Sequence, residues 1–337
     1  MIAAVRDYFA ELWDAWDGFW FTPSSPSTLS AIRVLAGAML LYTHLVWSLG
    51  LVDFFGQNGW LPQDLMKEVY AMGSDPDGAG PLVGTGRLIW SHFNYVHSPN
   101  LMWAIHIIAL VVFFFLTIGF FSRTMALLAF LFAVSYANRV TPGAYFGLDK
   151  INCMLALYLI VGPCGARYSV DRLWRLRRGN NEVPATSTAN LAIRLIQVHM
   201  CIIYLFSGIG KLQGEPWVMG DASWLSFGMY EYQSLDMTWI SRWPMLLNFM
   251  THATVFWELS YCALVWPALT RPWVLLMAVI VHLGIIIALG MPTFGLVMLI
   301  GNLAFVSPKM VRKVFDPFAR RVSLAVVGKA IKAGASE

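Results

Sequence analysis

The chain has 337 residues, of which 58% are hydrophobic and only 12% are charged. A soluble globular domain carries about 25% charged residues, so this composition excludes the soluble class and predicts an integral membrane protein. The formal net charge of +4 is spread along the chain and not gathered into a basic groove, which argues against binding to nucleic acid.

The first 22 residues are expected to form an amphipathic helix that lies in the membrane interface. Apolar residues recur there at three- and four-residue spacing, and acidic residues occupy the opposite face. The same acidic residues exclude a cleaved signal peptide, whose apolar core is uncharged. A break rich in Pro and Ser at residues 23–27 separates this helix from the next apolar run.

Eight apolar runs follow within residues 25–310 and predict one all-α domain, a polytopic transmembrane helical bundle of about eight spans. The third and fourth runs are short, so we expect them to be buried within the bundle. Long polar and aromatic loops at residues 50–100 and 212–250 are expected to fold over one face. The eight runs are residues 29–49, 101–121, 124–136, 150–162, 191–211, 251–269, 273–289 and 293–306.

The lysines and arginines are distributed unevenly about this topology. Most of the 23 fall on one side, which includes a linker at residues 164–190 and a basic tail at residues 311–337. The positive-inside rule places that side, together with both termini, in the cytoplasm. The two long loops are then expected on the outer face of the cell membrane.

A short polar stretch separates the third and fourth runs and ends in the acid–base pair Asp149–Lys150. Desolvation at the mouth of a membrane helix favours the neutral amine of a lysine, which can then accept a proton. A lysine in this place can equally snorkel and anchor the helix end at the interface. The residues alone leave both interpretations open.

Other polar residues lie within the apolar runs or at their outer ends. Lys211 ends the fifth run, and Glu258 lies about 10 Å inside the sixth at 1.5 Å per residue. Charged groups inside a membrane usually face a cavity or one another. We therefore expect one polar cavity that opens outward and is lined by Asp149, Lys150, Lys211 and Glu258. His199 and His282 fall near the middle of their runs.

Each of these residues also has a structural interpretation. Lys211 can snorkel, and a protonated Glu258 can serve only to fix helix packing. The two histidines can be satisfied core residues. The histidines, acids and four cysteines show no metal-ligand spacing, so no bound metal is expected.

An ordered series of short motifs is similar to a known family over about residues 25–310. The motifs are Gly147-Leu148-Asp149-Lys150 and residues 168–173, 193–197, 203–212, 217–220, 257–260 and 282–308. Together they resemble the HTTM (horizontally transferred transmembrane) family, whose best-known member is the vitamin K-dependent gamma-glutamyl carboxylase. Family distribution implies a bacterial inner membrane.

The resemblance implies a chemistry. In the carboxylase, a lysine in a Leu-Asp-Lys setting acts as the base toward vitamin K hydroquinone, and Lys150 occupies the matching position. The implied cofactor is reduced vitamin K or a related quinol, and the implied substrate is a glutamate of a protein or peptide. Such an enzyme is a lyase that forms a carbon–carbon bond. Membrane lipids are the other expected partners.

The segment after the lysine departs from the carboxylase, which has a Trp-Asn-Asn-His cluster there. Only Asn152 of residues 151–154 matches it. Two functions are therefore predicted. One is a quinone-dependent carboxylase or epoxidase with Lys150 and Asp149 as catalytic residues. The other is a non-enzymatic carrier or partner-binding module that uses the outward cavity. The further cavity-lining residues predicted are Lys211, Glu258, His282, His199 and Asn152.

Overall fold

The computed structural model describes residues 2–66, 90–139 and 147–334, and within these ranges the regular elements are helices. The predicted all-α bundle is confirmed. Two predicted regions lie partly outside the described residues: the first long loop at 67–89, and the polar stretch before Asp149 at 140–146. Only a single antiparallel bridge, Ser24 with Thr186, joins extended segments in the described part of the chain.

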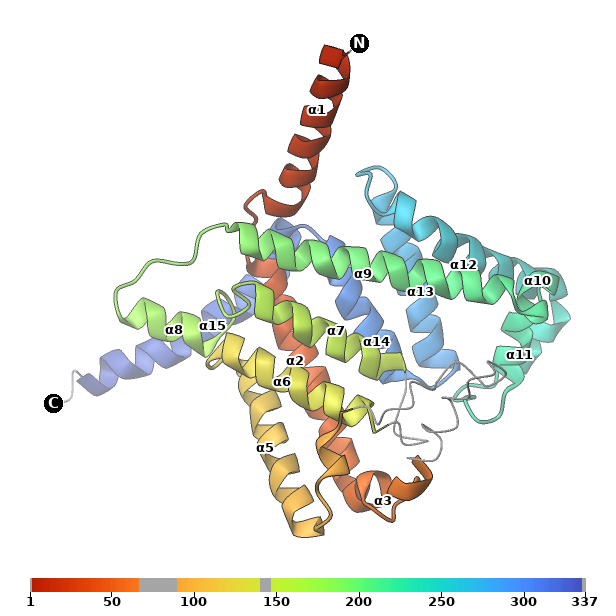
Figure 1. Cartoon of the computed structure of the whole chain (residues 1–337), viewed down its shortest axis with the longest axis horizontal. Coiled ribbons are helices and arrows are strands. Elements are labelled where there is room, and N and C mark those ends of the chain that lie inside the picture. Colours follow the sequence, from red (N-terminus) through yellow and green to blue (C-terminus); the bar gives the residue numbers. More distant parts are fainter. Residues whose placement is uncertain (1, 67–89, 140–146, 335–337) are drawn as a thin grey trace.

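The predicted N-terminal amphipathic helix is present as α1 (Ile2–Phe21), which projects away from the bundle (Figure 1). Most of its aromatic side chains are exposed, including Tyr8, Trp13 and Trp16. Arg194 and Asn190 bind the end of α1 by donating to its backbone carbonyls, and the Arg194 guanidinium lies over the Phe19 ring. The helix is thus fixed to the bundle at its C-terminal end.

All eight apolar runs fold as helices. α9 packs along α12, α6 along α7, and α2 along α5. The short α7 is central, because it contacts α2, α6, α9 and α14. The helices are α2 (Ser27–Trp47), α5 (Pro99–Ile118), α6 (Ser122–Ala137), α7 (Gly147–Val161), α9 (Ser187–Leu212), α12 (Pro244–Leu264), α13 (Arg271–Ala288) and α14 (Pro292–Asn302).

The expected count of about eight spans is too high by helix length and composition. Among the described residues, only four helices are long and apolar enough to cross a membrane. Three of them are α5, α9 and α13. The fourth covers residues 27–55, where α2 continues through η1 (Ser48–Gly50) into α3 (Leu51–Phe55). A fifth results if α14 and α15 (Pro308–Gly334), bent by 119°, count as one span.

The remaining helices fail for different physical reasons. α6 and α7 have 16 and 15 residues, whereas a membrane span needs about 20. α12 has 21 residues, but Asn248, Thr251 and Glu258 make it too polar. These helices are held by the bundle, and α7 in particular is enclosed by other helices.

Arg33 of α2 holds one end of the bundle together. This fully buried guanidinium donates to the carbonyls of Leu116 and Thr117 at the end of α5 (2.8 Å to Thr117). It also donates to Cys164 at 3.1 Å and to Tyr168 at 2.5 Å, after α7. The last carbonyls of a helix lack intrahelical donors and carry partial negative charge. A guanidinium there supplies the missing donors and its positive charge stabilises the helix end.

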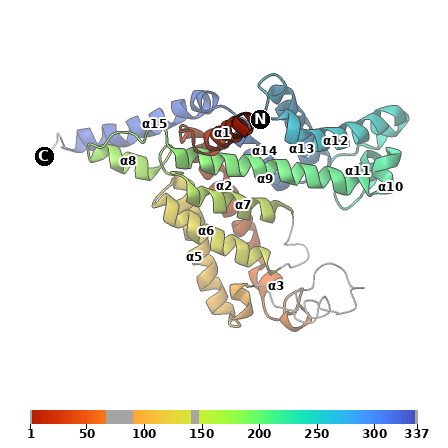
Figure 2. The same ribbon diagram turned by 45° about the horizontal axis from the view of Figure 1, so that its top comes forward.

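Asp171 completes this end of the bundle. It lies in α8 (Val170–Arg177) and accepts hydrogen bonds from the backbone N–H groups of Phe121 and Ser122, each at 2.8 Å, and from the Ser122 hydroxyl at 2.6 Å. Tyr168 donates to Asp316 of α15 at 2.9 Å. We call this region the basic end. Figure 2 shows α8 and α15 together there, with α10 (Glu215–Met219) and α11 (Ala222–Gly228) at the opposite end.

Candidate functional site

A cavity of about 820 Å³ lies among α7, α9, α12, α13 and α14, on the side away from the basic end. Most of its lining is apolar or aromatic. α10 and α11 contribute Trp217 and Phe227, and α14 contributes Phe294 and Met298. Ligand pockets in proteins typically have about 300–1,000 Å³ and this kind of lining, with a few polar groups that orient the ligand.

The structure brings five of the seven candidate site residues to this cavity. Lys150, Lys211, Glu258, His199 and His282 all line it. Asp149 and Asn152 do not line it, although both are buried in α7. Successive residues of a helix are rotated by about 100°, so these two residues leave the face that carries Lys150.

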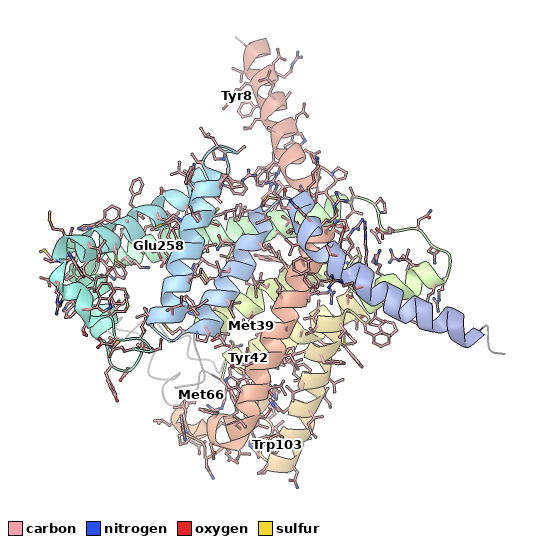
Figure 3. The ribbon with its side chains drawn as sticks, turned by 180° about the vertical axis from the view of Figure 1, so that it is seen from behind. Tyr8, Met39, Tyr42, Met66, Trp103 and Glu258 are labelled. Atoms are coloured by element: carbon pink, nitrogen blue, oxygen red, sulfur yellow. The ribbon has the colours of Figure 1, made fainter. Side chains whose placement is uncertain are left out.

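Lys211 and Glu258 form an ion pair across α9 and α12. The Lys211 ammonium lies 2.8 and 2.7 Å from the two carboxylate oxygens, and it donates to the Ser207 hydroxyl at 2.7 Å. It also lies 5.0 Å from the centre of the Trp217 ring. The side chains are 19% and 9% exposed, so a ligand in the cavity can approach the pair. Figure 3 labels Glu258 on α12.

Gly208 allows α9 and α12 to approach closely enough for this ion pair. A Cβ atom at Gly208 would lie 2.9 Å from Cδ2 of Leu259 and 3.2 Å from its backbone nitrogen. These contacts are tighter than nearly all real Cβ contacts, so a side chain here would require Leu259 to shift. Gly208 precedes Lys211 by about one helical turn, and Leu259 follows Glu258 directly.

A chain of hydrogen bonds leads from the core to His282. The amide Nδ2 of Asn302 donates to the carbonyl of Met298 at 2.9 Å and to the Tyr204 hydroxyl at 2.8 Å. The Tyr261 hydroxyl donates to Oδ1 of Asn302 at 2.6 Å. Because the Met298 carbonyl can only accept, it determines which way the Asn302 amide faces.

This chain ends at one ring nitrogen of His282. The Tyr204 hydroxyl, which accepts a hydrogen bond from Asn302, lies 2.7 Å from Nε2 of His282. When the hydroxyl donates this bond, a neutral imidazole carries its proton on Nδ1. Among the described residues, Nδ1 has no hydrogen-bond partner, although His282 is only 3% exposed. His282 thus brings to the cavity wall a buried ring nitrogen for which the described residues supply no partner.

His199 has a partner within the protein. Its Nδ1 lies 2.9 Å from the hydroxyl of Tyr158 in α7. The bond joins α7 to α9, so His199 contributes to helix packing as well as to the cavity wall.

Sequence reasoning missed several residues of this site. Tyr204 lies within a motif that carried the family resemblance, and Asn302 is a polar residue in an apolar run, but neither was assigned a role. Their contact joins positions 98 residues apart. No spacing rule in the sequence reveals such a pair.

A second polar cluster was also missed. His106 lies 2.5 Å from the Tyr136 hydroxyl and 2.8 Å from the Ser48 hydroxyl, and His92 lies 2.5 Å from the Ser135 hydroxyl. These residues come from α5, α6 and the ends of other segments, far apart in sequence. Within the described ranges, no group of His, Cys, Asp or Glu has the geometry of a metal site.

Comparison with known proteins identifies the family. The HTTM domain model matches residues 86–309, a range that includes every residue lining the cavity. No curated protein and no solved structure matches the chain. Because the match covers more than half of the 337 residues, the chain belongs to the HTTM family, and the resemblance drawn from its motifs is confirmed. With its long apolar helices, it is a membrane protein.

Proposed function

We propose that this HTTM protein is a membrane enzyme in which Lys150 acts as a base toward a quinol bound in the large cavity. One observation carries the proposal: the lysine of the Leu-Asp-Lys motif lines an apolar cavity that also contains the Lys211–Glu258 ion pair and His282. General bases must lie within reach of the proton that they remove, and a cavity wall provides that position.

The cavity suits a quinol in size and chemistry. A quinol has a flat aromatic ring, an apolar tail and two oxygen atoms. Phe227, Phe294 and Met298 offer apolar contacts, and His282, whose Nδ1 has no partner among the described residues, offers a ring nitrogen for one quinol oxygen. A reduced quinone supplies electrons and an acidic hydroxyl when bound. The protein excludes water, orients the ring and accepts the hydroxyl proton on the Lys150 amine.

The finer part of the proposal concerns the reaction. The family resemblance implies that quinol oxidation by oxygen is coupled to removal of a gamma proton from a glutamate side chain, with carbon dioxide adding to that carbon. The Lys211 ammonium is the cation in the cavity that can bind a substrate carboxylate, in competition with Glu258. A protein or peptide glutamate is therefore the proposed substrate.

We also propose that the basic end faces the cytoplasm, with both termini, and that the cavity faces the opposite side of the cell membrane, a bacterial inner membrane. The contacts of Arg33 and Asp171 support this, because they join the helix ends that the charge distribution assigns to one side. A reporter fused at the C-terminus tests the topology. A signal from outside the cytoplasm would refute it.

The test of the enzyme is epoxide formation. Membranes with the full chain are incubated with vitamin K hydroquinone and oxygen, and the epoxide is measured. We expect epoxide from the wild type and none from Lys150→Ala. Lys309→Ala, which removes an exposed lysine outside the cavity, is the matched control and should retain activity.

A second function is favoured by a specific observation. Asn152, the residue that matches the carboxylase after its lysine, does not line the cavity, and its Oδ1 lacks a hydrogen-bond partner among the described residues. If the lysine lacks this support, the protein would bind or carry a quinone-like lipid and catalyse no reaction on it. Folded wild type that binds several quinols but forms no epoxide from any of them would refute the enzyme and support this carrier.

A further inference from the structure

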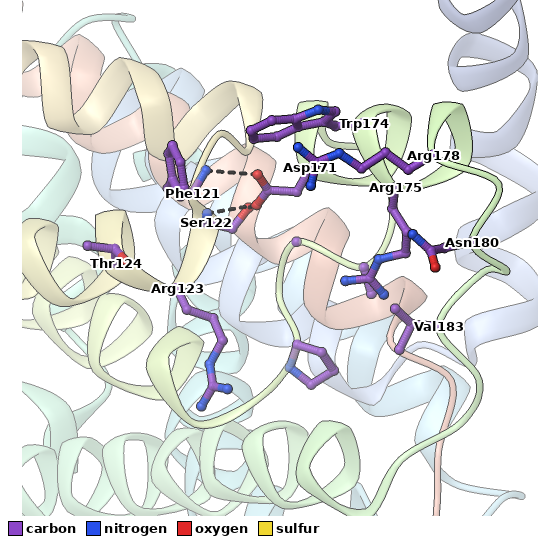
Figure 4. Close-up of a pocket in the computed structure, with 13 residues that line it drawn as sticks. Phe121, Ser122, Arg123, Thr124, Asp171, Trp174, Arg175, Arg178, Asn180 and Val183 are labelled. Carbon is purple, nitrogen blue, oxygen red and sulfur yellow. Dashed lines mark hydrogen bonds between the residues drawn. The ribbon is translucent and has the colours of Figure 1, made fainter.

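We propose that a second cavity, at the basic end, binds the phosphate group of an anionic phospholipid. It has a volume of about 430 Å³. Its walls come from the turn between α5 and α6, the loop after α7, and α8 with the segment that follows. Figure 4 shows three arginines around it: Arg123, Arg175 and Arg178. This inference is independent of the quinol site, because the two cavities share no residue.

Asp171 lines this cavity, but its carboxylate is bound elsewhere and does not pair with the three arginines. Both Asp171 oxygens accept hydrogen bonds from the start of α6, as Figure 4 shows. Arg123 donates to the Ile160 carbonyl at 3.3 and 3.2 Å. Within the described part of the chain, neither Arg175 nor Arg178 forms an ion pair. The cavity therefore carries excess positive charge.

The opposite side of α8 provides an internal contrast. There, Arg167 and Arg172 both pair with Glu182, at 2.7 Å for Arg167. Those arginines line a different cavity, between α8 and α15, together with Asp316. Arg167 and Arg172 thus share a carboxylate of the protein, whereas no carboxylate of the described residues pairs with Arg175 or Arg178, which are left to bind an external anion.

The anion is a phosphate because of the shape and number of the donors. A guanidinium presents paired N–H groups that match two oxygens of a phosphate. The Arg178 guanidinium lies 4.3 Å from the centre of the Trp174 ring, which holds it at the cavity. Arg123 adds a third cation from another helix, so the site surrounds the anion instead of touching it from one side.

The ligand is a lipid because the same cavity has an apolar rim. Phe121 and Trp174 are 52% and 43% exposed and line the cavity with Pro163 and Val183. Tryptophan is enriched where a membrane meets water, and Asp171 joins α8 to Phe121 and Ser122, just after the end of the long apolar helix α5. Anionic headgroups attract basic residues at that level. The aromatic rim can contact the glycerol and upper acyl carbons while the arginines bind the phosphate.

The test compares two double variants of the full chain. Purified protein is reconstituted with phosphatidylglycerol and phosphatidylcholine, and bound lipid is measured by native mass spectrometry. Arg175→Gln with Arg178→Gln removes two guanidiniums from the cavity. Arg177→Gln with Arg320→Gln removes equal charge from the neighbouring cavity. We expect phosphatidylglycerol binding to fall about tenfold or more in the first variant and to change less than about twofold in the second.

Three outcomes would overturn the proposal. Equal losses of phosphatidylglycerol binding in both variants would mean that the lipid is attracted to positive charge in general and not to this cavity. No loss in either would mean that the cavity binds no lipid. Binding of glycerol 3-phosphate as tight as that of phosphatidylglycerol, with the same dependence on Arg175 and Arg178, would assign the site to a soluble phosphate ester. Trp174→Ala should weaken lipid binding and leave glycerol phosphate binding unchanged. Thermal unfolding checks that each variant is folded.

Discussion

Arg33 and Lys211 are cations held inside the same bundle, at opposite ends, and they bind different kinds of partner. Arg33 donates only to backbone carbonyls, from segments that meet only in the folded chain. Lys211 binds the side chains of Ser207 and Glu258 on the wall of a cavity. The first arrangement holds helices in place. The second can exchange a protein carboxylate for one from a ligand, so we expect variants at the two ends to change different quantities.

The largest expected effect is at Arg33. Arg33→Gln leaves carbonyls at the end of α5 and after α7 buried without donors, and each such group costs about 1–3 kcal/mol. We expect a loss of more than about 3 kcal/mol of unfolding free energy, with little folded protein recovered. Arg6→Gln, which removes an exposed arginine of α1, is the control. Thermal unfolding in detergent measures both, and a midpoint for Arg33→Gln near that of wild type would contradict the expected role.

The next effect is at the ion pair. Glu258→Leu leaves the Lys211 ammonium in a largely buried place and should cost about 3 kcal/mol of stability. The double variant Lys211→Met with Glu258→Leu should recover much of this loss, because neither charge is then left alone. A double-mutant cycle from unfolding midpoints measures the coupling. Strictly additive effects would show that the contact contributes nothing to stability.

A smaller effect is expected at His282. His282→Phe should weaken quinone binding about tenfold by removing the unpartnered ring nitrogen, with a modest change in stability. Tyr204→Phe should weaken binding less. The imidazole of His282 remains in this variant, but it loses its hydrogen bond with the Tyr204 hydroxyl. Titration with a quinone gives both affinities. Equal affinity in wild type and His282→Phe would show that His282 forms no hydrogen bond with the quinone.

The smallest effect is a pH dependence at the basic end. Burial raises the pKa of Glu182, but the hydrogen bond from Arg172 and the charges of Arg172 and Arg167 outweigh burial and lower it. A carboxyl whose folded pKa is lowered stabilises the fold above its unfolded pKa of about 4.3, and this stabilisation is lost as pH falls through the folded value.

Glu182 is 35% exposed, so solvent screens the pair and its contribution is about 0.2–1 kcal/mol. Wild type should therefore unfold at a slightly higher temperature than Glu182→Gln at pH 7, and the difference should shrink and disappear as pH falls through the lowered folded pKa. A difference that grows on acidification would contradict the assigned sign.

The sequence was sufficient for the helical bundle and for much of the cavity. Apolar runs predict helices directly, and the depth of Lys211 and Glu258 in antiparallel runs is enough to place them together. The span count was wrong because an apolar run in a bundle can be enclosed by other helices, as α7 is, without the length of a span. Asp149 does not line the cavity beside Lys150, because adjacency in sequence does not mean a shared helix face. Tyr204 and Asn302 were missed because their contact depends on tertiary packing alone.

Gly208 has a consequence for the reach of Lys211. The ammonium contacts both oxygens of Glu258 close to the point where Gly208 lets α9 approach Leu259 of α12. A methyl group at Gly208 would lie 2.9 Å from the Leu259 side chain and 3.2 Å from its backbone nitrogen, so Leu259 would have to shift to admit it. The room left by one small residue thus bears on how closely two charges meet on neighbouring helices.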